Sequence, residues 1–90
     1  MRRMTCNNLP VRGERKFGQL RGVFFKRASE GIVLFVRDAS GAGREDRLAY
    51  PVLANGTLSN SGAFNIDPDE TVQLFDCRDL GIEPGVPEIV

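Results

Sequence analysis

Two strongly apolar runs separated by a short polar segment constrain the fold of this chain more than any other feature. The first run is 23–25 (Val-Phe-Phe) and the second is 32–36 (Ile-Val-Leu-Phe-Val). Valine, isoleucine and phenylalanine are enriched in strands, and the connecting segment 28–31 (Ala-Ser-Glu-Gly) has the composition of a hairpin loop. Its glycine can take positive φ without a Cβ clash. The pattern predicts a β-hairpin over residues 23–36.

The side chains of this hairpin predict a sheet that is covered on both faces. Successive strand residues point to opposite faces, so Val23 and Phe25 share one face and Phe24 lies on the other. The run 32–36 is apolar at every position, which is typical of a strand in mid-sheet or in a barrel wall. The strand-like pattern that leads into the hairpin begins at Phe17.

A third strand is predicted over residues 47–54, with Leu48, Tyr50 and Val52 on one face. Pro51 has no N–H to donate, so this strand belongs at a sheet edge or a bulge.

Asn55-Gly56 is the strongest turn signal, because a type I′ turn needs positive φ at both central residues. The segment 57–66 that follows is rich in Ser, Asn and Gly. Since it has few large apolar residues, we expect a weak strand at the periphery.

Residues 67–80 leave two alternatives open. Asp67, Pro68 and Glu70 have the form of a helix start with an N-cap and a capping box. However, at about 100° per residue the apolar side chains of 72–80 spread around the whole helix and leave no polar face. The segment 71–77 also has a strand-like composition. A turn followed by a strand is therefore preferred, and a helix is the alternative.

These segments predict an all-β fold, a small five-stranded barrel or sandwich of the SH3-like or OB-like kind. The chain has 90 residues, which is enough for one hydrophobic core. We expect a basic flexible arm at 1–16, a single β domain at 17–80 and an extended apolar and acidic C-terminal tail at 81–90.

Charge is distributed unevenly although the formal net charge is zero. Residues 1–30 carry eight basic and two acidic side chains, a net charge of +6, whereas residues 67–90 carry seven acidic and one basic, a net charge of −6. Such complementary ends favour docking within one molecule or head to tail between copies.

Catalytic and metal chemistry have little support. The chain contains no histidine, which removes the commonest general base and the usual zinc ligand sets. Cys6 and Cys77 form no CxxC pair, and a disulfide between them is the less favoured alternative. The acids at 67–70 do not fit a calcium loop. We expect no enzyme activity, no cofactor and no metal.

One stretch, 15–27, interleaves basic residues with Phe17, Phe24 and Phe25. Single-strand nucleic-acid binders combine phosphate contacts with base stacking in this way. In the competing interpretation the phenylalanines are core and the charges are a solvated face. The basic candidate binding residues are Arg15, Lys16, Arg21, Lys26 and Arg27.

The tail offers a second kind of binding, because an extended segment with prolines and branched residues can add to a sheet edge of its own or another molecule. Its candidate contact residues are Ile82, Val86, Ile89 and Val90.

The sequence therefore favours a non-enzymatic protein-interaction or self-assembly module, such as a small complex or virion component or an inhibitor of a protein partner. The alternative is a single-stranded nucleic-acid-binding protein that uses residues 15–27. The longest apolar run has five residues, far below the roughly 18 of a membrane helix. Without a signal peptide, we expect no membrane association and a cytoplasmic or virion-associated location.

Overall fold

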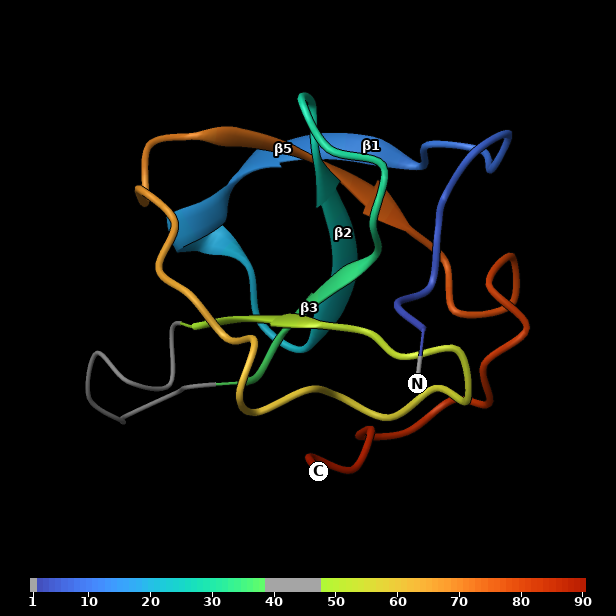
Figure 1. Cartoon of the computed structure of the whole chain (residues 1–90). Helices are drawn as coiled ribbons and strands as arrows, with labels where there is room; N and C mark the ends of the chain where they lie inside the picture. Colours follow the sequence, from blue (N-terminus) through green and yellow to red (C-terminus); the bar gives the residue numbers. More distant parts are fainter. Residues whose placement is uncertain (1, 39–47) are drawn as a thin grey trace.

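Five antiparallel strands form one sheet in the order β1-β5-β2-β3-β4 (Figure 1). The computed structural model describes residues 2–38 and 48–90. Over these residues the only helical segment is the three-residue 3-10 turn η1 (Phe17–Gln19), which is far too short to cross a membrane. The all-β class and the number of strands are confirmed. The strands are β1 (Gly13–Lys16), β2 (Val23–Arg27), β3 (Leu34–Val36), β4 (Ala49–Pro51) and β5 (Thr71–Phe75).

The predicted hairpin, β2 followed by β3, is confirmed and lies in the middle of the sheet. Phe24 is opposite Phe35 across the β2–β3 pair, and their ring centroids are 4.8 Å apart. On the other side β2 pairs with β5, where Phe24 is opposite Phe75. Strand β2 therefore has a hydrogen-bonded neighbour along both edges, so its backbone groups have partners where Phe24 and Phe25 are buried.

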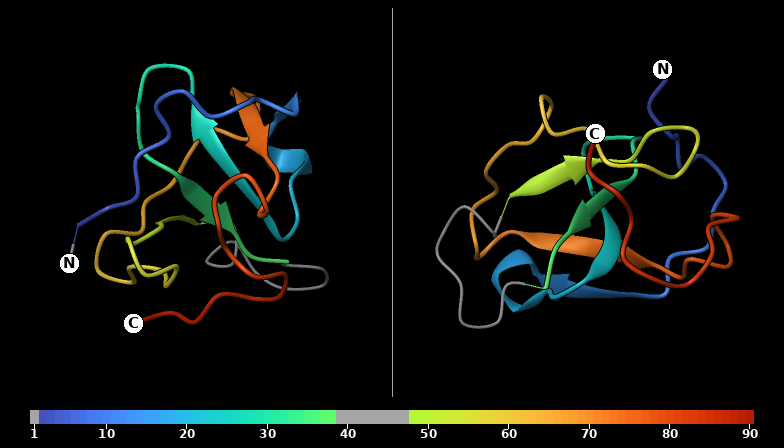
Figure 2. Two further views of the ribbon diagram at one scale, coloured as in Figure 1. Left: turned by 90° about the vertical axis from the view of Figure 1, so that its right-hand side faces the viewer. Right: turned by 90° about the horizontal axis from the view of Figure 1, so that it is seen from below.

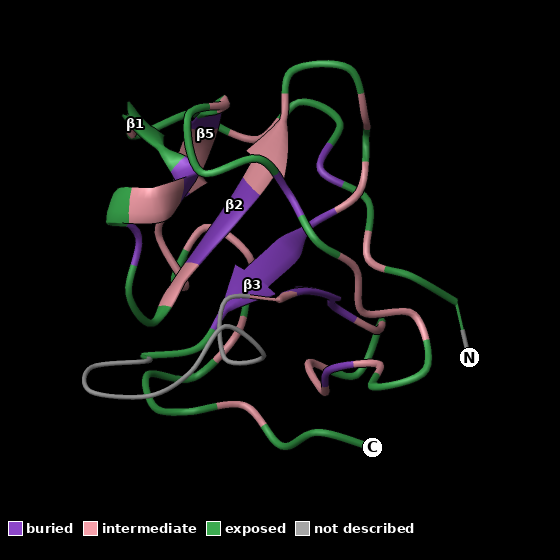
Figure 3. Ribbon diagram, turned by 90° about the vertical axis from the view of Figure 1, so that its left-hand side faces the viewer, coloured by how far each residue is buried: buried purple, intermediate pink, exposed green. Residues whose placement is uncertain are grey.

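Both faces of the sheet are covered, as the alternation in β2 predicts. Phe24 belongs to one apolar cluster, whereas Phe25 and the half-buried Val23 pack in a second cluster on the other face. Every residue of β3 is buried (Figure 3). The first cluster contains Cys6, Phe24, Val33, Phe35, Tyr50, Val52, Leu58 and Phe75. The second contains Phe17, Leu20, Phe25, Leu34, Val36, Ala49, Ile66 and Val72.

The alternatives for residues 67–80 are resolved in favour of a turn and a strand. Glu70 N–H donates to the Asp67 carbonyl at 3.0 Å, which closes the turn, and Asp69 N–H donates to Asp67 Oδ1 at 2.9 Å. The strand that follows, β5, lies between β1 and β2. Val72 on β5 is fully buried, so the apolar residues that fit no helix face fit the two faces of a strand.

The third predicted strand is also confirmed in part as β4, although Arg47 lies outside the described residues. Leu48, Tyr50 and Val52 pack against one cluster, as expected for one face. Pro51 lies in an edge strand of the five-stranded sheet, where a missing N–H costs least.

One strand prediction was wrong. The segment 57–66 forms only isolated bridges, at Leu58 and Phe64, because its Ser-Asn-Ser-Gly centre turns instead, with Gly62 N–H donating to Ser59 Oγ at 3.2 Å. Small and polar residues offer a sheet little to pack. The fifth strand is instead β1, inside the segment expected to be a flexible arm. Its Glu14, Arg15 and Lys16 are exposed, which suits a short edge strand that faces water.

The expected strand pattern from Phe17 is interrupted by η1, which brings the Phe17 ring to 5.4 Å from the Phe25 ring. The turn at Asn55-Gly56 is present but is not type I′. Only Gly56 has positive φ, at 86°, and Leu53 N–H donates to the Thr57 carbonyl at 2.7 Å across a three-residue loop.

The segment before β1 is also attached to the sheet rather than extended from it. Met4 N–H donates to the Val52 carbonyl at 2.7 Å, and the Met4 carbonyl accepts from Val33 N–H at 3.0 Å. Residues 33 and 52 lie just beyond the paired parts of β3 and β4, so Met4 satisfies backbone groups that would otherwise lack partners. Cys6 is buried against the same region.

The last residues of the C-terminal tail form backbone hydrogen bonds with the segment that follows β4. Leu58 N–H donates to the Glu88 carbonyl at 2.7 Å and Val90 N–H donates to the Leu58 carbonyl at 2.8 Å. The five-stranded sheet itself is open, with β1 and β4 at its edges, so closure into a barrel is not confirmed. Figure 2 shows the tail passing along the side of the molecule away from β1.

Candidate interaction surface

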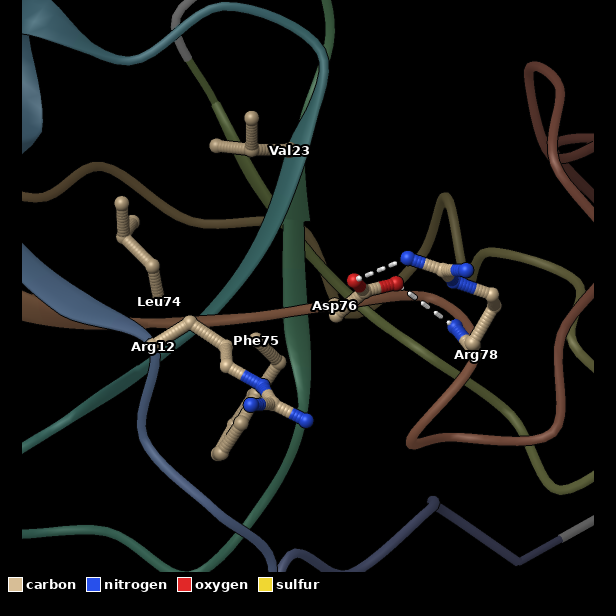
Figure 4. A pocket seen from close by; sticks show the side chains of 6 residues that line it. All are labelled: Arg12, Val23, Leu74, Phe75, Asp76 and Arg78. Atoms are coloured by element: carbon tan, nitrogen blue, oxygen red, sulfur yellow. Dashed lines mark hydrogen bonds and ion pairs between the residues drawn. The ribbon is translucent and has the colours of Figure 1, made fainter.

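An open pocket of about 440 Å³ lies where β5 ends beside the start of β2 (Figure 4). Its apolar side chains come from β2 and β5, and its charged ones come from the segments next to β1 and β5. The lining residues are Val23, Leu74, Phe75, Arg12, Asp76 and Arg78. A concave surface of this composition suits a small apolar side chain with a polar group beside it.

The charges around this pocket are already paired. Arg12 donates from Nε and Nη2 to the Asp79 carboxylate at 2.7 and 2.8 Å, and these hydrogen bonds raise the pKa of Arg12. Asp76 Oδ1 accepts the Arg78 backbone N–H at 3.0 Å, which lowers the pKa of Asp76. The hydrogen bonds thus favour the charged forms of Arg12 and Asp76, and the pocket presents guanidinium groups beside a carboxylate.

A second bidentate ion pair joins the end of β2 to the acidic turn. Arg27 donates from Nη2 and Nε to the two carboxylate oxygens of Glu70 at 2.7 and 2.8 Å, and from Nη1 to Glu30 at 3.1 Å. The hydrogen bonds from Arg27 lower the pKa of Glu70. Both bidentate pairs join the basic first third of the chain to its acidic last third. The charge complementarity predicted from the sequence is therefore met, at these two places, within one molecule.

The five basic candidates all contact acceptors within the molecule. Arg15 and Lys16 are exposed on β1, Arg21 is exposed between η1 and β2, and Lys26 and Arg27 are half-buried at the end of β2. Besides the contacts of Arg27, the partners are the Glu14 carbonyl for Arg15 (2.9 Å), the Asp69 carbonyl for Lys16 (3.2 Å), Asp38 for Arg21 (3.9 Å) and the Arg27 carbonyl for Lys26 (3.2 Å).

The aromatic half of the nucleic-acid signal is not on the surface. Phe17, Phe24 and Phe25 expose only 2%, 5% and 0% of their area. Base stacking needs an exposed ring face. This burial is the outcome expected if the phenylalanines are core.

The four candidate tail residues differ in their exposure. Ile82 packs against the first apolar cluster, and its N–H donates to the Cys77 carbonyl at 3.0 Å. Val86, Ile89 and Val90 expose 83%, 37% and 64% of their area. They are three of the four exposed large apolar residues in the described ranges, and Val11 (44%), just before β1, is the fourth.

The structure does not bring the basic and the tail candidates together. Strand β1, with Arg15 and Lys16, lies on the opposite side of the molecule from residues 86–90 (Figures 1 and 2). Sequence reasoning also missed Arg12 and Asp79 as a pair and Val11 as an exposed apolar residue. The opposite charges of the two ends were a general signal for such pairs, but they did not identify the residues.

Both cysteines are free thiols, so the less favoured disulfide is not formed. Cys6 is buried in the first apolar cluster, and this burial raises the pKa of its thiol. A raised pKa lowers the thiolate fraction and with it the nucleophilicity of the group.

Comparisons with protein-family models, with curated proteins and with solved structures found no match to this chain.

Proposed function

We propose that the protein is a non-enzymatic interaction module that binds a protein partner or further copies of itself. The observation that carries this proposal is the exposure of Val86 and Val90, 83% and 64%, in a chain whose other large apolar residues are mostly buried. Large apolar side chains left in water together with an open sheet edge are typical of binding segments.

The chemistry of the charged groups supports binding rather than catalysis. The arginines and carboxylates of the pocket are held in ion pairs and hydrogen bonds, and the buried Cys6 thiol has a raised pKa. Nucleophilic or acid–base catalysis needs the reverse, an activated group in a cleft.

We also propose that the five-stranded sheet is part of a small barrel or sandwich. Phe17 and Leu20, which follow β1, pack in one cluster with Ile66, from the segment that extends the β4 edge. We therefore expect the sheet to curve so that the segment after β1 and the segment around Ile66 approach each other on this face.

Light scattering over a concentration series tests the proposal. We expect the mean mass to exceed that of one chain as concentration rises, or a defined complex to form with a protein partner. Val86→Ser with Val90→Ser should weaken the association, and Ala54→Ser, which changes an exposed apolar residue outside the tail, should not. A monomer at low and high salt that forms no protein complex would overturn the proposal.

The nucleic-acid alternative is tested by titrating labelled single-stranded DNA and RNA at about 50 mM salt, where phosphate contacts are strongest. We expect no saturable binding, because the phenylalanine rings are buried. Salt-sensitive binding that Arg15→Glu removes would instead support the alternative.

A further inference from the structure

The hydrogen-bonded array has two open edges of opposite character. Beyond β4 it continues through the bridges Ala49–Phe64 and Val52–Leu58 and then through Leu58–Ile89 to the tail. One end of the array is therefore β1, and the segment 88–90 is the end that is reached through Leu58. Unpaired strand edges are templates for pairing with another chain.

At the β1 edge the outward groups belong to Glu14 and Lys16. Phe17 N–H donates to the Glu70 carbonyl at 2.9 Å, so this residue points its backbone toward β5. Because the direction alternates along an antiparallel strand, Arg15 also faces β5, and Glu14 and Lys16 face away. The Glu14 carbonyl is contacted only by the exposed Arg15 side chain, a contact that an incoming strand can replace.

At the tail edge the outward groups belong to Ile89. Leu58 bonds to the Glu88 carbonyl and to Val90 N–H, which is the pattern of a parallel bridge centred on Ile89. The N–H and C=O of Ile89 therefore point away from Leu58. Among the described residues neither group has a hydrogen-bond partner.

The exposed apolar side chains lie at these same two edges. Val11 precedes β1, and Val86, Ile89 and Val90 belong to the tail edge. Together they are the exposed large apolar residues in the described parts of the chain. This placement is independent of the hydrogen-bond pattern, and it gives both edges apolar area to bury.

The two edges also have complementary charge. Residues 11–16 carry a net charge of +2, and residues 83–90 carry −2. Two copies of the same edge would repel each other, so β1 against β1 and tail against tail are disfavoured. The edges lie on opposite sides of the molecule (Figures 1 and 2), so one copy can use both at once.

We propose that the acidic, apolar segment 86–90 of one copy adds as a strand to the basic β1 edge of the next copy. Contact between two different surfaces of the same chain is heterologous, so copies join head to tail and form a ring or an open chain. This inference rests on the self-assembly half of the proposed function and gives it a geometry.

Charge reversal at each edge tests the inference. Arg15→Glu with Lys16→Glu reverses the β1 edge, and Glu83→Lys with Glu88→Lys reverses the tail edge. Each double variant alone should weaken self-association by about tenfold or more, measured by analytical ultracentrifugation at low salt. Mixing the two variants should restore association, since each supplies the complement of the other. Arg2→Glu, which changes the head charge away from β1, is the matched control.

A backbone variant tests strand addition itself. Ile89→Pro removes an N–H that makes no hydrogen bond inside the molecule, so it should prevent pairing with the next copy while the unfolding transition stays unchanged. Wild-type association that is unaffected by Ile89→Pro and by both charge reversals would overturn the edge geometry and leave self-assembly standing. A strictly monomeric wild type would overturn this inference and the self-assembly half of the proposed function together. Association only with an added basic or acidic peptide would overturn copy-to-copy pairing and leave protein binding standing.

Discussion

Strand β2 and the C-terminal segment 88–90 are both short, extended and apolar, but the molecule holds them in different ways. β2 lies between two strands and beneath side chains on both faces, and Phe25 is completely buried. The segment 88–90 is hydrogen-bonded to Leu58 and to Asn60, whose N–H donates to the Val90 carbonyl at 3.0 Å, and its Ile89 and Val90 side chains remain exposed. β2 is thus held by side-chain packing in addition to hydrogen bonds along both edges, whereas the tail is held mainly by backbone hydrogen bonds. The comparison teaches that apolar composition alone does not tell a core strand from a binding segment.

The largest difference between the two regions should appear when an apolar side chain is truncated. Phe25→Ala removes a fully buried ring in contact with the Phe17 ring, so we expect a loss of about 3–5 kcal/mol in the free energy of unfolding. Val86→Ala, in the exposed tail, should change it by no more than about 0.5 kcal/mol. Urea denaturation followed by far-UV circular dichroism measures both. Equal effects would mean that the two regions are held alike.

A smaller loss of stability is expected from a substitution at Gly18. This residue lies in η1, whose Phe17 ring packs against Phe25 of β2. A Cβ at this position would lie 2.8 Å from Pro68 Cβ and 3.2 Å from the Pro68 carbonyl oxygen. Gly18→Ala must therefore push the acidic turn away from η1, and we expect a loss of about 1–3 kcal/mol. The exposed Gly81 has open space around its Cβ position but a φ of 70°, so it is no control for this test.

Gln19→Ala, at an exposed position in the same 3-10 turn, is the matched control for Gly18→Ala. Its unfolding free energy should stay within about 0.5 kcal/mol of the wild-type value. If both variants unfold at the same urea concentration, the close approach of Gly18 and Pro68 contributes no measurable stability.

The Arg27–Glu70 ion pair at the end of β2 should make the free energy of unfolding depend on pH. Arg27 lowers the pKa of Glu70 in the folded state, so the carboxylate stabilises the fold above its unfolded pKa, and this contribution is lost as pH falls through the folded pKa. At pH 7 we expect Glu70→Gln to cost about 1 kcal/mol, as for a favourable, partly exposed bidentate pair. The difference from wild type should vanish in acid.

Urea unfolding of wild type and Glu70→Gln from pH 7 downward gives this dependence. In an Arg27→Met background the Glu70→Gln effect should be small at every pH, because the partner is already absent. A difference that persists in acid would show that the glutamine perturbs packing rather than charge.

The sequence predicts those strands whose own residues form an apolar pattern. The runs at 23–25 and 32–36 identify β2 and β3, and the absence of a polar helix face identifies β5 as a strand. Strand β1 could not be found in this way, because Glu14, Arg15 and Lys16 have no apolar alternation. It pairs with β5, which lies more than fifty residues away in the sequence. This pairing therefore cannot be inferred from the local sequence of either strand.

The candidate surface was predicted only in part for the same reason. The tail residues were identified because apolar side chains between prolines are unusual in a solvated segment. The pocket could not be predicted, since it combines Arg12 with Val23 and Phe75 from three distant segments. Conversely, the phenylalanines of 17–25 gave a nucleic-acid signal because basic residues interleaved with phenylalanines occur both in a core strand with solvated charges and in a base-stacking surface.

The smallest predicted effect separates the inner and outer sides of the tail. Val90 N–H donates to the Leu58 carbonyl at 2.8 Å, whereas Ile89 N–H points outward. Val90→Pro should therefore weaken the attachment by about 1 kcal/mol, which corresponds to roughly fivefold faster amide exchange at Leu58 and Asn60. Ile89→Pro should leave both exchange rates unchanged in dilute protein. Both variants should keep the global unfolding free energy, because the buried strands do not depend on the tail. If Ile89→Pro accelerates exchange as much as Val90→Pro, the tail is held by its side chains after all, and its difference from β2 is one of degree.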